Sequence, residues 1–458
     1  MTVAERLASF AAHASYASLS EAARQALKAH VLDALGCAIG ALDAGPVEMV
    51  RAHIDEFGGA PLATCIGGGR TAPDRAAFFN GALVRYLDYN DAYLAPGETC
   101  HPSDNLAPVL AAAEYADRDG ADLLVALGVA YQVQCRLSDA APVRRRGFDH
   151  TTQGAYAVAA GVARALGLSV RDTAHALAIS GTAFNALRVT RTGRLSHWKG
   201  LAYPSVAASA ANATFLAMRG VTGPLEVFEG NKGLMETISG PFEIDWEKED
   251  LDRVCRTILK RYNAEIHSQS ALEGLLELRT EAGLEGTNVE RIELETFDVA
   301  YDIIGGGEEG DKRVVSTKEE ADHSLPYMLA VAMLDGEVMP AQYRPERIAA
   351  SDVQALLRRV VVRPADDLSR RFPAEMPCRL RVILRDGRRL EAAKRDYEGF
   401  VTRPMTWERV IEKFTRLAGS RADPSLRRAI VEAVERLEGV KIRDVVDLLA
   451  RLGRERTT

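Results

Sequence analysis

Apolar residues recur at three- and four-residue spacing from Ser20 to about Gly240, which is the pattern of amphipathic helices. Ser20-Glu21 has the residue types that begin a helix, and the run it opens ends near Ala41. Alanine and glycine line many of these helix faces, so the helix axes can approach closely. The pattern therefore predicts a bundle of tightly packed helices, with further helices at 106–116, 122–138 and 152–166.

The pattern of hydrophobic residues changes between about 275 and 405, where apolar and polar residues largely alternate with period two. Alternation covers Arg291–Val299 and Cys378–Arg385, and Val360–Pro364 is a short β-branched run. Asp386-Gly387 has the composition of a hairpin turn and leads into Arg388–Ala392. This stretch predicts a small α/β domain.

Helical periodicity resumes after Pro404, in three further runs. A chain of 458 residues exceeds the roughly 250 to 300 residues at which one hydrophobic core stops growing. We therefore predict a mainly α protein: a large all-helical domain formed by residues 1–272 and 406–458, and a smaller α/β (α+β) domain formed by residues 273–405. The C-terminal helices, which would return to the first domain, are expected at 407–417, 424–437 and 444–452.

Composition excludes several classes of protein. Hydrophobic residues make up 47% and charged residues 26%, as in ordinary globular domains, and no stretch is apolar enough to predict a membrane span. The net charge of −7 disfavours nucleic acid as a partner. The six cysteines are dispersed without a Cys-x-x-Cys pair, so we expect no structural zinc, no iron-sulfur cluster and no other cofactor. The start of the chain lacks the pattern of a leader, and we expect a cytoplasmic protein.

The segment from Tyr86 to Asn105 holds most of the candidate chemistry. Asp88, Asp91, His101 and Asp104 place three carboxylates and one imidazole within about seventeen positions, and the prolines and glycine among them exclude one continuous helix. His101 precedes a proline and so lies in extended or turn backbone, where nearby carboxylates favour its protonated form. His101 is thus a candidate proton shuttle; on spacing alone, a solvated loop histidine is the alternative.

His150 is a second candidate. It stands just before the alanine-rich helix that starts near Thr152, where free backbone N–H groups and the helix dipole attract a carboxylate ligand. An imidazole at this point can both bind a carboxylate and transfer a proton. The alternative from the residues alone is a helix-capping role.

Three motifs together resemble the MmgE/PrpD family, whose members act on small polycarboxylates. The Leu-Asp-Tyr-Asn-Asp and His-Pro-Ser-Asp-Asn pieces, at 87–91 and 101–105, look like the family signature, with a separation similar to that in its 2-methylcitrate dehydratases. Ala-Asp-His-Ser-Leu-Pro-Tyr at 321–327 is similar to a second family block, and Lys260-Arg261-Tyr262 to a third. The resemblance implies the same two-domain fold.

The resemblance also implies a set of site residues. A functional histidine precedes the same helix in family members, which supports His150. Family members similarly supply lysines at Lys199 and Lys260, and from composition alone Lys199 and the pair Lys260-Arg261 would be called solvated surface residues. Asn263 and Glu265 depart from the family pattern, where proline and then cysteine or histidine are usual. The predicted catalytic residues are Asp88, His101, His150, Lys199, Lys260 and Tyr327, and the predicted substrate-binding residues are Asp91, Ser103 and His323.

These residues suit a metal-free hydro-lyase. Dehydration of a 2-hydroxy polycarboxylate needs a base, an acid and cations that hold the carboxylates. The resemblance points to 2-methylcitrate and propionate catabolism, and to a homodimer; cis-aconitate decarboxylation and iminodisuccinate epimerisation are alternatives on the same scaffold. A noncatalytic protein that binds a polycarboxylate or a protein partner is the alternative from another class. From the residues alone, His323 could equally be a helix cap.

Overall fold

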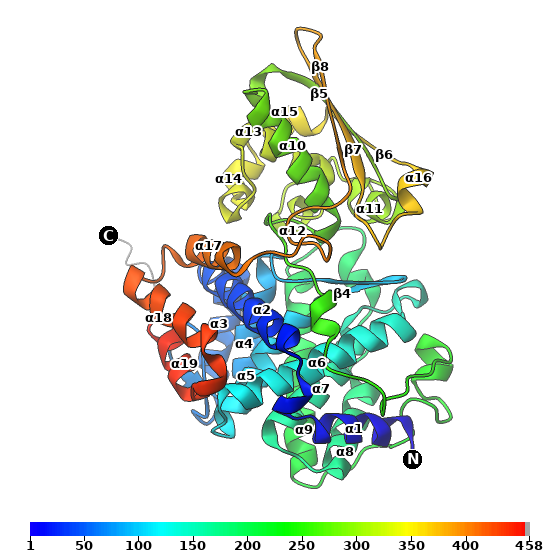
Figure 1. Ribbon diagram of the computed structural model, residues 1–458, viewed down its shortest axis with the longest axis vertical. Helices are drawn as coiled ribbons and strands as arrows, with labels where there is room; N and C mark the ends of the chain where they lie inside the picture. Colours follow the sequence, from blue (N-terminus) through cyan, green and yellow to red (C-terminus); the bar gives the residue numbers. More distant parts are fainter. Residues whose placement is uncertain (454–458) are drawn as a thin grey trace. The chain divides into compact units, whose positions relative to one another are not determined.

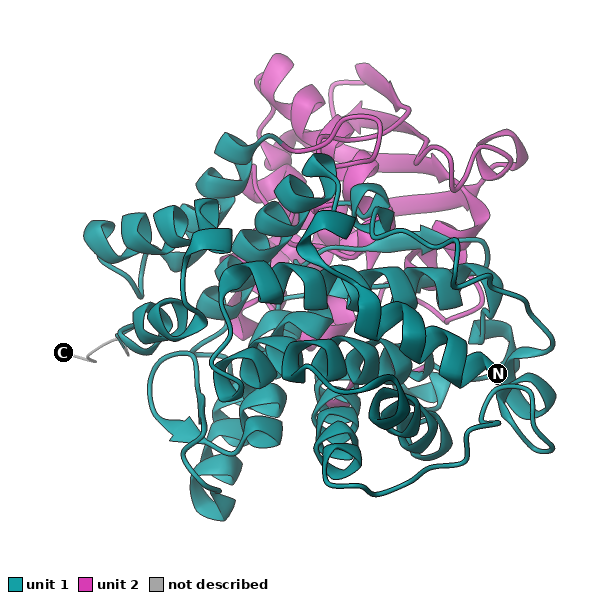
Figure 2. Ribbon diagram, turned by 60° about the horizontal axis from the view of Figure 1, so that its bottom comes forward, with its two compact units in different colours: residues 1–190, 200–258, 406–458 teal, residues 191–199, 259–405 magenta. Residues whose placement is uncertain are grey.

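The computed structural model describes residues 1–453, and the chain forms two compact units (Figure 2). Residues 1–190, 200–258 and 406–458 make up the first unit, and residues 191–199 and 259–405 the second. The first unit is helical and the second contains a small mixed sheet, so the predicted fold class is confirmed. The domain boundaries at 272/273 and 405/406 stay a prediction.

The first unit is a bundle of helices linked by short turns and by longer loops (Figure 1). Its three chain segments are joined within the bundle, since α2 near the start of the chain packs against α17 near its end. The helices are α1 (Val3–His13), α2 (Glu21–Gly40), α3 (Gly45–Phe57), α4 (Pro73–Tyr86), α5 (Leu106–Tyr115), α6 (Gly120–Ala140), α7 (Thr151–Leu166), α8 (Val170–Ala183), α9 (Trp198–Met218), α17 (Trp407–Ala418), α18 (Pro424–Glu435) and α19 (Ile442–Ala450).

Small residues bring these helices together, as the sequence predicts. A Cβ atom added at Gly36 of α2 would lie 3.2 Å from the Phe414 backbone of α17. At Gly161 of α7 an added Cβ would lie 2.9 Å from the Cβ of Ala130 on α6. Such spacing leaves no room for larger side chains, so the glycines set the distance between helix axes.

Helix ends follow the expected capping chemistry where the sequence shows it. The Ser20 side chain accepts a hydrogen bond from the Ala23 backbone, so Ser20 is the N-cap of α2. One helix was not predicted: α1 begins at Val3, after a capping box made by Thr2 and Glu5. Another helical stretch was predicted too long. The pattern predicted helices to about Gly240, but α9 ends at Met218 and is followed by turns and short helical segments.

Two short hairpins interrupt the bundle. The first pairs β1 (Ala63–Thr64) with β2 (Arg70–Thr71), and the glycines at 67–69 form its turn with positive φ angles. The second pairs β3 (Tyr93–Ala95) with β4 (Glu98–Cys100) and lies between Asp91 and His101. This second hairpin brings the two signature pieces back beside each other.

The second unit is built on a four-stranded sheet in the order β6-β5-β7-β8. The central strand β5 (Val289–Thr296) pairs in parallel with β6 (Val360–Pro364) and antiparallel with β7 (Cys378–Leu384). β8 (Arg389–Lys394) follows the turn at Asp386-Gly387 and pairs antiparallel with β7. All four strands fall where alternation or β-branched runs predict them, although β5 ends before Phe297.

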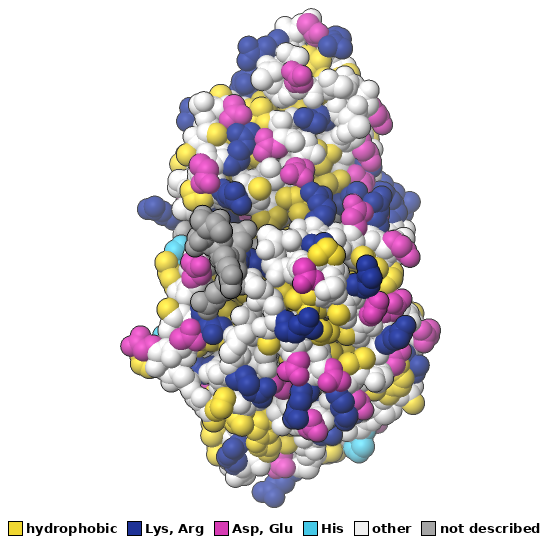
Figure 3. Space-filling view, turned by 90° about the vertical axis from the view of Figure 1, so that its left-hand side faces the viewer, with side chains coloured by type: hydrophobic (Ala, Val, Ile, Leu, Met, Phe, Trp, Pro, Cys, Tyr) yellow, Lys and Arg dark blue, Asp and Glu magenta, His cyan; other side chains and the backbone are white. Residues whose placement is uncertain are grey.

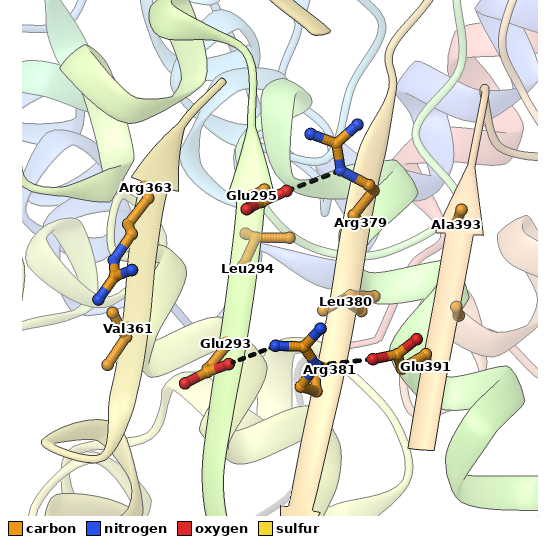
Figure 4. Close-up of a pocket in the computed structure, with 11 residues that line it drawn as sticks. Glu293, Leu294, Glu295, Val361, Arg363, Arg379, Leu380, Arg381, Glu391 and Ala393 are labelled. Carbon is orange, nitrogen blue, oxygen red and sulfur yellow. Dashed lines mark hydrogen bonds and ion pairs between the residues drawn. The ribbon is translucent and has the colours of Figure 1, made fainter. Parts of the chain in front are cut away.

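Helices cover one face of this sheet and leave the other exposed. Helices α10 (Gln269–Glu281) and α13 (Leu325–Asp335) contact the strands, and α15 (Ser351–Leu357) packs on α13. The opposite face carries cross-strand ion pairs: Arg381 bridges Glu293 and Glu391, and Arg379 contacts Glu295 (Figure 4). Charged side chains of this kind favour contact of this face with water. The shorter helices of this unit are α11 (Asp298–Ala300), α12 (Lys318–Ala321), α14 (Pro345–Ile348) and α16 (Asp366–Ser369).

The surface mixes charges of both signs. On the face shown in Figure 3, lysine and arginine side chains are interspersed with acidic ones and do not gather into one basic patch. Residues 1–453 contain no helix with both the length and the apolar character that a membrane crossing requires.

Candidate functional site

The loop between α4 and α5 carries the first group of candidate residues, and its start is held by charge. Asp88 has a positive φ of 54°, which is uncommon for a residue other than glycine. Its carboxylate accepts a hydrogen bond from Arg85 at 2.6 Å, and the guanidinium of Arg85 also lies 3.7 Å from Asp104. Arg85 thus joins two of the predicted carboxylates in a buried cluster.

Asparagines tie the same loop together. The Asn90 side chain donates to Ser103 at 2.9 Å and to Asp104 at 2.8 Å. Asn105 donates to Gln134 of α6 at 2.6 Å and accepts from the Tyr203 hydroxyl of α9 at 3.0 Å. The polar side chains of the signature pieces therefore mostly bond to each other and to neighbouring helices, which fixes the loop.

His101 is oriented by the backbone of Asp91. Its Nδ1 atom lies 2.7 Å from the Asp91 carbonyl oxygen, and a carbonyl only accepts, so Nδ1 carries a proton. The neutral ring therefore keeps Nε2 as its basic nitrogen. The side chain is buried with the rest of the loop, so it is not the solvated histidine of the alternative interpretation.

The structure brings His150 next to His101. The two ring centroids are 5.5 Å apart with the rings at 73°, and the His150 ring also stacks on Tyr203 at 6.0 Å. His150 stands at the N-cap position of α7, but its side chain makes no capping hydrogen bond. The Asp149 carboxylate accepts from the Thr151 backbone instead, and it lies 3.2 Å from Nδ1 of His150. Asp149 therefore has the capping role, and the His150 imidazole lies beside that of His101.

Asp91 and Ser103, predicted to bind substrate, are wholly buried and bond to one another. The Ser103 hydroxyl and backbone N–H both donate to the Asp91 carboxylate, at 2.7 Å and 3.0 Å. Burial opposes ionisation of Asp91, but His30 and Ser103 outweigh it and lower the pKa of the carboxyl. Both residues sit in the interior of the loop.

The second unit holds its own cluster of buried charges around Asp322. Lys199 donates to Asp322 at 2.6 Å and lies 2.8 Å from Nδ1 of His323, and Lys318 contacts the other carboxylate oxygen at 2.6 Å. Burial opposes ionisation of Asp322, yet Lys199, Lys318 and His323 hold its pKa well below the usual range. Lys199 is buried, not a surface lysine, and Ser324 rather than His323 caps α13.

Lys260 is fully buried in the second unit. Close to it in sequence, the Glu265 carboxylate accepts from the His267 backbone and lies 2.7 Å from Nδ1 of His267. Burial opposes ionisation of Glu265, but His267, His323 and Lys260 together lower its pKa to about 2. The glutamate that departs from the family pattern is therefore an ionised member of a mainly cationic cluster.

Tyr327 lies in a different environment from the other candidates. Its ring belongs to the hydrophobic core of the second unit, and its hydroxyl donates to the backbone carbonyl of Gln342. Burial raises the pKa of this hydroxyl. A catalytic role for Tyr327 stays a prediction.

Sequence comparison shows the family of this chain. The MmgE/PrpD N-terminal domain matches residues 5–247, and the MmgE/PrpD C-terminal domain matches residues 262–439. The chain belongs to the MmgE/PrpD family. The resemblance inferred from the three motifs is thereby confirmed.

Several MmgE/PrpD relatives align over most of this chain. The 2-methylcitrate dehydratase of Cupriavidus necator is 28% identical over 82% of this chain and 82% of its own length. The mitochondrial 2-methylcitrate dehydratase of Yarrowia lipolytica is 25% identical over 94% of this chain and 87% of its own. The cis-aconitate decarboxylase of Mus musculus is 25% identical over 81% and 77%. This MmgE/PrpD protein is accordingly an enzyme, a lyase similar to the 2-methylcitrate dehydratases.

Some residues around the MmgE/PrpD motifs were missed in the sequence. His30, Tyr131 and Arg85 contact the loop from helices, where single polar residues do not stand out. One signal was available: Lys28, His30 and Asp33 lie within an otherwise apolar stretch of α2 and are all buried. Buried charges of this kind need partners, so their presence on one helix indicates a polar network in the core.

Proposed function

We propose that this protein removes water from a 2-hydroxy polycarboxylate and that 2-methylcitrate is its substrate. The observation that carries the proposal is the buried pair His101–His150, in which Nδ1 of His101 is held as a donor and Nε2 is the basic nitrogen. Two adjacent imidazoles can act as a base and an acid, since a histidine side chain can both accept and donate a proton.

Dehydration needs a proton taken from the carbon next to a carboxylate and a proton given to the departing hydroxide. We assign these two transfers to His101 and His150, without deciding which is base and which is acid. Asp88, fixed by Arg85, would tune the charge around His101. Buried polar surroundings strengthen such effects because water does not screen them.

The cations of the second unit have a separate task in this proposal. Lys199 and Lys260, with His323, are expected to bind carboxylate groups and to offset the charge that develops when the proton leaves. Lys199 is held by Asp322 and so does not need to be ordered when substrate binds. Tyr327 is expected to donate a proton or a hydrogen bond to the substrate.

Decarboxylation of cis-aconitate is the second candidate, and the similarity to the mouse cis-aconitate decarboxylase favours it over epimerisation of iminodisuccinate. All of these reactions start from a bound polycarboxylate. A binding protein without catalysis would bind the same compounds with no turnover. A homodimer, a cytoplasmic location and a role in propionate catabolism belong to the proposal as well.

The deciding experiment incubates purified, EDTA-treated protein with 2-methylcitrate, citrate, cis-aconitate and iminodisuccinate and follows products by proton NMR. We expect loss of water from 2-methylcitrate, with unchanged activity after EDTA because the assigned groups are side chains. Carbon dioxide release from cis-aconitate would favour the second candidate. Absence of turnover on all four compounds would contradict the proposal.

A further inference from the structure

A buried ion pair beneath the His101 loop is not used by the chemistry above. Nδ1 of His30 on α2 lies 2.9 Å from Oδ2 of Asp91, and the Tyr131 hydroxyl on α6 donates to the same oxygen at 2.8 Å. His30 is 5% exposed and Asp91 is 0% exposed. Together with the two hydrogen bonds from Ser103, four contacts converge on one carboxylate.

The protons in this network can be placed by elimination. Nε2 of His30 lies 2.8 Å from the Thr257 hydroxyl, which itself donates to the Val254 carbonyl and so accepts from His30. Nδ1 of His30 faces the Asp91 carboxylate at 2.9 Å. His30 therefore links the Thr257 hydroxyl to Asp91 inside the bundle.

Asp91 connects this ion pair to His101 through its backbone. Its side chain holds the turn at Ser103, while its carbonyl oxygen accepts from Nδ1 of His101 at 2.7 Å. Displacing the carboxylate would therefore displace the carbonyl that fixes the imidazole. Asp91 has no exposed surface through which to bind a substrate.

We propose that His30, Asp91 and Tyr131 are positioning residues that hold His101 in the tautomer protonated at Nδ1. The inference rests on the proposed function only in taking His101 as a proton-transfer group. It gives Asp91 and Ser103 a role beneath His101 in place of the direct substrate contact expected from the sequence. Helices α2 and α6 thereby set the reactivity of a loop residue.

The least disruptive test is Tyr131→Phe, which removes one hydrogen bond to Asp91 and keeps the ring. We expect kcat to fall by about tenfold, the worth of one hydrogen bond of roughly 1 to 1.5 kcal/mol, with KM within about twofold. Tyr156→Phe is the matched control, since the Tyr156 hydroxyl is also buried in the first unit but has no hydrogen-bond partner among residues 1–453. An equal kcat in Tyr131→Phe and Tyr156→Phe would overturn the inference.

A second measurement does not depend on turnover. Protein labelled with ¹⁵N in its imidazole rings, with His101 assigned from the signals lost in His101→Gln, reports which nitrogen carries the proton. We expect a protonated Nδ1 and a bare Nε2 in the parent, and a mixture of tautomers in Tyr131→Phe. A proton on Nε2 in the parent would refute positioning, whereas a correct tautomer without turnover of any substrate would refute the proposed function alone.

Discussion

At the scale of single residues, the first unit fixes the orientation of a buried histidine. His101 is oriented by the backbone carbonyl of Asp91, and the Asp91 carboxylate is held by an ion pair with His30 of α2 and a hydrogen bond from Tyr131 of α6. A buried ion pair contributes little net stability, because desolvation of the charges offsets their attraction. The contribution of the His30–Asp91 pair is to hold the Asp91 backbone that orients His101.

Replacing His101 by glutamine tests its catalytic role. Glutamine keeps a hydrogen-bonding group but cannot transfer a proton, so kcat should fall by about 10² to 10⁴-fold while KM changes little. Steady-state kinetics with 2-methylcitrate would measure both. His13→Gln, at an exposed position on α1, is the control and should keep full activity. A His101→Gln variant with parental kcat would exclude the assignment.

Glu265 makes the stability of the protein depend on acid pH. Its pKa is lowered from the usual 4.5 to about 2 in the folded state, so its contribution is complete above about pH 4.5 and is lost as pH falls toward 2. At about 1.4 kcal/mol per unit of pKa difference, the contribution is on the order of 3 kcal/mol. Urea unfolding of Glu265→Gln should show this loss at pH 7 and a smaller difference near pH 3.

Glu281→Gln at the end of α10 is the matched control for that experiment, because Glu281 is exposed in the same unit. It should follow the parent at both pH values. If Glu265→Gln were as stable as the parent at pH 7, the cationic surroundings assigned to Glu265 would be wrong.

Residue types could be predicted better than their contacts. The sequence singled out His101 and His150, and the structure places their rings side by side. It did not single out His30 or Tyr131, because a lone polar residue on an apolar helix shows no spacing that points to its partner. Asp91 was predicted to bind substrate; in the structure its carboxylate is buried and bonded to Ser103 and Tyr131, and the substrate contact stays a prediction.

At the scale of elements, the position of α7 decides where His150 lies. Gly161 lets α7 approach α5 and α6, since a Cβ there would lie 2.9 Å from Ala130 and 3.0 Å from Val109. The strands and the Ser20 cap of α2 could be predicted because alternation of apolar and polar residues and helix capping both depend on residues close in sequence. The end of α9 could not, because it depends on packing against distant segments. The start of α1 was missed although its capping box at Thr2 and Glu5 is a local signal.

Gly161→Ala should therefore destabilise the protein by about 1 to 3 kcal/mol through overpacking. Thermal or urea unfolding would measure the effect. Gly45→Ala at the start of α3 is the control, since nothing lies within 4 Å of an added Cβ there. It should leave stability within about 1 kcal/mol of the parent or raise it. Equal stability of both variants would contradict the close approach of α7.

At the scale of the whole molecule, we expect two copies of the chain to associate. Light scattering coupled to size-exclusion chromatography should give twice the mass of one chain across a tenfold range of concentration. The prediction comes from the family resemblance and from small-residue helix faces. A monomeric mass throughout that range would contradict it, whereas a mass that falls on dilution would indicate a weak dimer.

The pairing of α2 with α17 has a consequence for how the protein is made. A ribosome adding about 5 to 20 residues per second releases α2 tens of seconds before α17. During that interval the face of α2 around Gly36, against which Phe414 packs in the folded protein, is exposed to solvent. The nascent chain therefore carries an uncovered apolar helix until α17 has been synthesised. Chaperones that bind apolar surfaces are expected to bind it during this time.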